Sequence, residues 1–331
     1  MKVLLINSDS GPDYLADLVN YYFISNRNEV FTNHRLDFLF NDFKNKSDLY
    51  GKGFTLYGKL EHSLKSSLTI LSVEEILDSI EKYDLIIFTS IQRNFKNNSL
   101  KESYFHLLNK KNPNKEIYVI DGEDHQLVDE EIASKSKYFK RELTEKYKSN
   151  AFPISFCYPE NELPLKRIEI KDKTQLLAPM DPRFLNSYIY DEEGYYQQYS
   201  KSIFGTTTKK AGWDCMRHYE ILSVNTLPFF PGIEDKPKLT MINFPIKLQN
   251  EVNKLFKKLI LDEQNVDTLE QIRLKYYTKN PFLGKVKKVS TKLSKLNIFE
   301  NNMNKLEKLN LEFQNWFKQE GLTSSYEKLF K

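Results

Sequence analysis

Side chains able to bind a phosphorylated ligand are concentrated in residues 205–220, GTTTKKAGWDCMRHYE. A hydrophobic core does not require this density of hydroxyl, amine, guanidinium and carboxylate groups. If Asp214 lies at or near a helix N-cap, Arg217 falls in the first turn and Glu220 one turn further along. Free N–H groups at a helix N-terminus and a guanidinium bind phosphate oxygens, and a carboxylate accepts hydrogen bonds from ribose hydroxyls. The segment therefore predicts a site for a phosphorylated nucleotide.

The same segment supplies further candidates for ligand binding. They are Thr206, Thr207, Thr208, Lys210, Gly212, Trp213 and His218. Threonine hydroxyls and the lysine would add donors for phosphate oxygens, and a glycine lets the backbone approach a ligand. In the alternative interpretation, Trp213 only anchors a helix, and Arg217 and Glu220 form an ion pair on the helix surface.

A second polar cluster, VIDGEDHQ, follows a run of apolar residues. Its candidate catalytic groups are Asp121, Glu123, Asp124 and His125. Parallel sheets bind ligands at the carboxyl ends of their strands, and a carboxylate or imidazole there could remove a proton from a hydroxyl. Asp124 and His125 are favoured as the base. The alternatives are a solvated loop that caps a helix and a magnesium or manganese site, and we predict no metal.

Lys140 and Arg141 follow a short apolar run and add two cations. They could reach ligand phosphates across a cleft, because guanidinium and ammonium groups both bind phosphate. A charged surface segment is the alternative.

Strands and helices alternate along the chain. Apolar runs predict strands over 2–7, 84–89 and 116–121, edge strands over 137–139 and 154–156, and helices over 14–23, 73–82 and 100–109. A further strand is predicted over 174–178 and a helix over 192–199, with strands near 202 and 227 and helices after 245. This alternation is typical of an α/β protein with a mainly parallel sheet.

The length of 331 residues suits two domains. A polar, proline-containing stretch over 159–172 resembles a linker, so we place the boundary near residue 165. The prediction is two Rossmann-like lobes, 1–165 and 166–331, the second ending in a helical extension.

The run GWDCMRHYEILSVNTLPFFP, residues 212–231, resembles the donor lobe of glycosyltransferases with the two-Rossmann-lobe (GT-B-like) architecture, particularly the spore-coat-type and exostosin-like families. The pattern is an arginine, two residues, a carboxylate, an apolar helix, a short turn and a proline-containing apolar strand. Arg217, Glu220 and Pro228 match it in order. Asn225 stands where the family usually has glycine, and asparagine also tolerates a left-handed conformation.

The resemblance implies that Glu220 binds the ribose of a nucleoside-diphosphate sugar, and that Arg217 and Lys210 bind the diphosphate. It also implies metal-independent sugar transfer, without a cofactor, to a glycan, a lipid-linked acceptor or another surface-polysaccharide acceptor. The alternative is a non-catalytic protein of the same fold that binds a nucleotide or a glycan.

Composition narrows the choice of partners. With 49 basic and 45 acidic side chains the net charge is only +4, so no nucleic-acid partner is predicted. Neither a dinucleotide-binding GxGxxG motif nor a P-loop is present.

Two widely spaced cysteines and no membrane-spanning run predict a cytoplasmic protein. The lysine-rich, amphipathic segment 282–299 allows a peripheral contact with the inner face of a membrane, and a helix packed on its own domain is the alternative.

Overall fold

Two parallel β-sheets form the framework of the molecule. The computed structural model describes residues 1–7, 13–46, 49–89, 99–164, 167–183, 187–261 and 297–330. The larger sheet has the strand order β3 (Leu68–Ile70), β2 (Glu29–Thr32), β1 (Lys2–Ile6), β4 (Leu85–Thr89), β5 (Ile117–Asp121), β6 (Lys137–Lys140) and β7 (Phe152–Pro153). All neighbouring strands in it pair parallel, which confirms the predicted α/β class.

The central strands of the larger sheet are buried along their whole length. β4 and β5 have the sequences LIIFT and IYVID, and every residue in them is buried. Such continuous apolar runs are expected where helices cover both faces of a parallel sheet. The strand order reverses direction at β1, which lies between β2 and β4. Ligands of open parallel sheets bind outside the carboxyl ends of the strands at this kind of position.

Helices connect several of these strands. They are α1 (Tyr14–Ser25), α2 (Val73–Ser79), α3 (Ser99–Lys111) and α4 (Glu130–Ala133). The Asp13 side chain caps α1 by accepting hydrogen bonds from the N–H groups of Leu15 and Ala16. Ser72 and Glu75 form a reciprocal capping box at the start of α2.

The smaller sheet has three parallel strands in the order β10 (Leu227–Phe229), β9 (Ser202–Thr206) and β8 (Gln175–Leu177). Its helices are α5 (Glu192–Ser200), α6 (Met216–Ser223), α7 (Ile246–Leu261) and α10 (Asn297–Glu320). The connection from β9 to β10 runs through α6. The predicted helices and strands of this region are present, although the sheet has fewer strands than the larger one.

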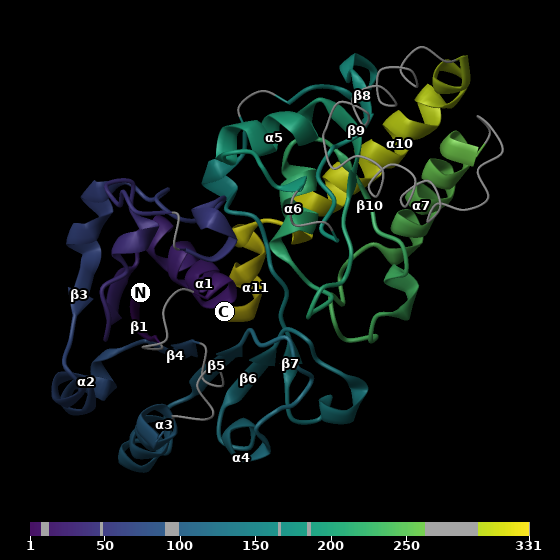
Figure 1. The fold of residues 1–331 in the computed structure, drawn as a ribbon. Helices are drawn as coiled ribbons and strands as arrows, with labels where there is room; N and C mark the ends of the chain where they lie inside the picture. The colour runs from purple at the N-terminus through teal and green to yellow at the C-terminus, as the bar shows by residue number, and fades with distance from the viewer. Residues whose placement is uncertain are drawn as a thin grey trace.

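The C-terminal part of the chain returns to the first sheet. α10 extends from the smaller sheet toward α11 (Glu327–Phe330), which lies beside α1 (Figure 1). The Phe330 ring centroid lies 5.2 Å from that of Phe23. One continuous cluster of buried side chains includes both Val3 of β1 and Phe204 of β9. The two sheets therefore share a hydrophobic core, and the boundary near residue 165 stays a prediction.

Within the described part of the chain, no helix combines the length and the apolar character needed to cross a bilayer. Most of the lysine-rich segment 282–299 lies outside the described residues, and only its last three positions fall in α10.

Candidate ligand-binding site

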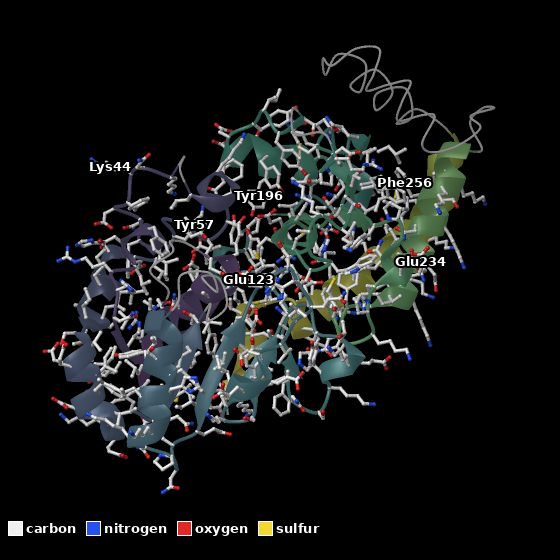
Figure 2. The ribbon with its side chains drawn as sticks, turned by 60° about the horizontal axis from the view of Figure 1, so that its bottom comes forward. Lys44, Tyr57, Glu123, Tyr196, Glu234 and Phe256 are labelled. Carbon is white, nitrogen blue, oxygen red and sulfur yellow. The ribbon has the colours of Figure 1, made fainter. Side chains whose placement is uncertain are left out.

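A cavity of about 690 Å³ lies where loops from the two sheets meet. Its lining includes the N-terminus of α1, the loop after β5, and the loop between β9 and α6. Eight of the predicted site residues line it, namely Glu123, Asp124, Arg141, Lys210, Gly212, Asp214, Arg217 and Glu220. Figure 2 labels Glu123 near the middle of the molecule. Residues from both predicted clusters, far apart in the sequence, therefore share one cavity.

Arg217 brings a positive charge to the cavity. No carboxylate of the described residues forms an ion pair with its guanidinium, and its buried Nε has no hydrogen-bond partner. The guanidinium lies over the ring of Tyr188, 5.6 Å from the ring centroid, and the buried Tyr188 hydroxyl also has no partner. Since buried polar groups in proteins are almost always hydrogen-bonded, these two groups favour an anionic ligand.

Lys210 adds a second cation to the same cavity. Partial burial lowers the pKa of its ammonium, and the positive charge of Arg217 lowers it further. The two cations repel each other, and an anion bound near both would be attracted to each of them and would relieve this repulsion. This arrangement fits a di-anionic group such as a diphosphate.

The N-terminus of α6 faces this cavity, with Asp214 next to the N-cap and Arg217 in the first turn, as predicted. Cys215 occupies the N-cap position, and its side chain makes no capping hydrogen bond. The first N–H groups of a helix have no acceptor within the helix, and Met216 and Arg217 in this first turn line the cavity.

Asp214 holds the loop in place instead of capping α6. Its carboxylate accepts hydrogen bonds from the Phe156 N–H at 2.7 Å and from the Tyr219 hydroxyl at 3.1 Å. Burial raises the pKa of Asp214 to about 7, and the nearby Arg141 opposes that rise. Asp214 lines the cavity, but its carboxylate serves the packing of the loop.

Glu220 is buried at the edge of the cavity. One carboxylate oxygen accepts a hydrogen bond from the Tyr195 hydroxyl at 2.7 Å, and the other accepts one from Thr55. Burial raises the pKa of Glu220, and these two hydroxyl donors lower it. The carboxylate forms no ion pair with Arg217, so the alternative of a surface ion pair is wrong. Each carboxylate oxygen has two lone pairs, which leaves acceptor capacity for a ligand.

Asp121 and Lys140 lie outside the cavity. They face each other in the register of β5 and β6, and the Lys140 ammonium lies 2.8 Å from Asp121, with both side chains fully buried. The Tyr138 hydroxyl donates to the second oxygen of Asp121 at 2.6 Å. The predicted roles of Asp121 as a base and of Lys140 as a phosphate ligand do not fit these positions.

Arg141 is a structural bridge between the two sheets. Its guanidinium donates to the Gly122 carbonyl at 2.9 Å and to Glu142 at 3.0 Å, and it also contacts Asp124 and the carbonyl of Asp214. These partners take four of its five N–H donors, so Arg141 mainly joins the two sheets, and its predicted contact with ligand phosphates stays a prediction.

The candidate bases differ in their access to the cavity. Glu123 and Asp124 line it, and the Asp124 side chain is 49% exposed although it pairs with Arg141. His125 is exposed outside the lining, where its Nδ1 accepts a hydrogen bond from the Leu127 N–H at 3.2 Å. Of the two favoured bases, Asp124 stays a candidate and His125 does not.

His218 and its neighbours stabilise the loop between β9 and α6. The buried imidazole donates from Nε2 to the Trp213 carbonyl at 2.8 Å, and its Nδ1 lies 2.8 Å from the Thr207 hydroxyl. Burial lowers the pKa of His218 to about 4, so the ring is neutral at pH 7. His218, Trp213, Thr207, Thr206 and Thr208 are not part of the cavity lining, so their predicted contact with a ligand does not fit.

Aromatic side chains that were not predicted as site residues form one wall of the cavity. Tyr14, Phe54, Phe156, Tyr188, Tyr190 and Tyr195 all line the cavity. A sequence signal existed for one part of it, because three glycines fall within eight residues at Gly51, Gly53 and Gly58, each with positive φ. Glycines so closely spaced indicate a tightly turned loop.

Comparison of the chain with protein-family models and with curated protein sequences finds no match.

Proposed function

We propose that this chain is a glycosyltransferase that binds a nucleoside-diphosphate sugar in the 690 Å³ cavity. The observation that carries the proposal is the Arg217 guanidinium, which lines the cavity with a buried Nε that has no partner. A diphosphate offers oxygens that a guanidinium binds through paired, charge-assisted hydrogen bonds.

The cavity provides a complementary group for each part of such a donor. Arg217, Lys210 and the first turn of α6 bind the diphosphate, and Glu220 accepts hydrogen bonds from the ribose hydroxyls. Tyr188 and Phe54 supply apolar surface for the base or the sugar. In this proposal the two sheets belong to two Rossmann-like lobes, 1–165 and 166–331, of a GT-B-like enzyme.

In the proposed reaction, an acceptor hydroxyl oxygen forms a bond to the anomeric carbon of the sugar. The bond between that carbon and the diphosphate oxygen breaks, and the nucleoside diphosphate leaves with the electron pair. The acceptor proton passes to a carboxylate, for which Asp124 and Glu123 are the candidates in the cavity. Arg217 and Lys210 stabilise the negative charge that develops on the leaving group.

The acceptor in this proposal is a glycan, a lipid-linked saccharide or another surface-polysaccharide precursor. The enzyme acts in the cytoplasm, at or near the inner face of the membrane. It uses no metal cofactor, because cationic side chains take the position that a metal would otherwise have at the diphosphate.

A thermal-shift screen of the purified chain with UDP-, GDP-, ADP- and CDP-sugars tests the proposal. A ligand present at about a hundred times its Kd stabilises the folded state by about 2.7 kcal/mol, so at least one donor should raise Tm by several degrees. Release of the nucleoside diphosphate in the presence of acceptor saccharides should follow for the same donor. A chain whose Tm responds to no nucleotide sugar would contradict the proposal.

A non-catalytic nucleotide-binding protein is the second candidate, and one observation favours it. Asp124 already pairs with Arg141, and Asp121 pairs with Lys140 outside the cavity. In that case a nucleotide sugar would raise Tm without release of nucleoside diphosphate across a broad panel of acceptors.

A further inference from the structure

Residues 51–58 cross from the first sheet to the helices of the second and form part of the cavity wall. The Lys52 ammonium donates to the Tyr188 carbonyl at 2.6 Å, and the Thr55 N–H donates to Glu192 of α5 at 2.7 Å. Two parts of the chain meet here, and Figure 2 labels one residue of each, Tyr57 and Tyr196. The segment therefore brings side chains from the first half of the sequence next to residues of the second half at the cavity.

Thr55 holds an unfavourable backbone conformation within this segment. Its φ is +71°, in the left-handed region that β-branched residues rarely adopt, and the residue is 1% exposed. Glycine would adopt this φ without strain and occurs three times in residues 51–58. Strained residues of this kind persist where the surrounding structure fixes them and cluster at ligand-binding sites. The threonine side chain must therefore contribute contacts that glycine lacks.

Those contacts lead directly to Glu220. The Thr55 hydroxyl donates to one carboxylate oxygen of Glu220, and it lies 2.7 Å from the Tyr196 hydroxyl, which can donate to it in turn. Tyr195 donates to the second oxygen of the same carboxylate. Donors on both oxygens fix the plane of the carboxylate, and each oxygen keeps a lone pair for another donor.

We propose that Thr55 is a positioning residue, which orients the Glu220 carboxylate so that it accepts hydrogen bonds from the ribose diol of a bound nucleoside diphosphate. This inference rests on the proposed function for the identity of the ligand. The orientation of Glu220 by Thr55 is a separate claim, which a measurement without ligand tests. Through this contact, a residue in the first half of the chain determines how tightly the Glu220 carboxylate in the second half binds the ribose.

Two substitutions separate the hydroxyl from the shape of the side chain. Thr55→Val keeps the volume and the β-branch but removes the donor, whereas Thr55→Ser keeps the donor and reduces the steric strain. We expect Thr55→Val to weaken binding of the preferred nucleoside diphosphate about tenfold, the effect of losing one hydrogen bond to a charged group. Thr55→Ser should bind within about threefold of the wild type. Thr55→Ala provides a smaller variant without the hydroxyl if Thr55→Val does not fold.

Titration of the Glu220 carboxyl by NMR, with ¹³C-labelled glutamate and Glu220→Gln for assignment, provides the test without ligand. Because the Thr55 hydroxyl lowers the pKa of Glu220, its removal should raise that pKa, and Thr55→Ser should leave it near the wild-type value. If Thr55→Val binds as tightly as the wild type, or if its Glu220 titrates like the wild type, the inference is overturned. If the wild type binds no nucleoside diphosphate, the proposed function fails, and the titration still decides whether Thr55 orients Glu220.

Discussion

Burial acts in opposite directions on two titratable groups beside the cavity. It raises the pKa of Asp214 to about 7 and lowers the pKa of His218 to about 4. Between about pH 4 and 6.5 the folded state retains a proton on Asp214 that the unfolded chain has lost, so this carboxyl makes stability fall as pH rises. Over the same range the unfolded chain retains a proton on His218 that the folded state lacks, so the imidazole makes stability rise. The two effects offset each other in the wild type.

Replacing His218 by glutamine should uncover the effect of Asp214. Glutamine can keep contacts with Trp213 and Thr207 but does not titrate. From pH 4.5 to 6.5 the unfolding free energy of His218→Gln should fall relative to the wild type by about 1–2 kcal/mol, since a full pKa unit corresponds to about 1.4 kcal/mol. Urea unfolding at a series of pH values measures this difference. Parallel pH profiles for the two proteins would show that His218 is not held neutral by burial.

Arg217 and His218 are neighbours in α6, and the sequence alone does not show which of them reaches the cavity. The sequence predicts both Arg217 and His218 as ligand-binding groups because both side chains can bind phosphate. In the structure Arg217 lines the cavity, whereas His218 packs against Phe230 with a distance of 4.6 Å between ring centroids. Successive residues of a helix point about 100° apart, so a shift of one residue in the helix start decides which of them reaches a ligand. The residue types alone do not determine the residue at which the helix starts.

At the scale of elements, Gly212 allows the loop before α6 to pack against the end of β6. A Cβ at this position would lie 2.6 Å from Asp124 Oδ1, 2.7 Å from Arg141 Nη1 and 2.8 Å from Glu142 Oε1. Side chains do not approach this closely, so a methyl group would have to displace an ionic cluster that joins the two sheets. The glycine serves this contact between elements.

Gly212→Ala should lower the unfolding free energy by about 1–3 kcal/mol, the usual cost of overpacking a closely packed site. It should also weaken nucleotide binding, because Asp124 and Arg141 both line the cavity. Gly232→Ala is a useful control, since Gly232 has φ +77° but no atom within 4 Å of an added Cβ. Its cost should be conformational only, about 1 kcal/mol, with unchanged binding. Denaturant unfolding and calorimetry provide both readouts, and wild-type behaviour of Gly212→Ala would refute the packing argument.

The elements themselves were predictable to different degrees. β1, β4 and β5 follow from continuous apolar runs, and α1 and α2 follow from their patterns and acidic first turns. β2 and β3 were not predicted; they have four and three residues, and β3 contains no buried residue. Strands so short lack a distinctive apolar pattern, and only pairing with their neighbours identifies them.

At the scale of the whole molecule, the cavity depends on contacts between distant parts of the sequence. The segment 205–220 reveals part of the site because several of its contributors are close together in the chain. Thr55 and Tyr188 lie 165 and 32 residues from Glu220 and carry no motif, so the sequence alone does not connect them to the site. The core shared by the two sheets brings them together. The same dependence explains why Lys140 and Asp121 look available in the sequence and are buried in the structure.

The central claim is that Arg217 binds the diphosphate of a nucleotide, and calorimetric titration of Arg217→Gln tests it most directly. Arg167→Gln is a matched control, because Arg167 bonds to Gln314 and does not line the cavity. With the nucleoside diphosphate that the wild type prefers, Arg217→Gln should weaken binding about tenfold or more, as expected for loss of charge-assisted hydrogen bonds, while Arg167→Gln binds normally. A folded Arg217→Gln protein that binds the nucleotide with wild-type affinity would contradict the account.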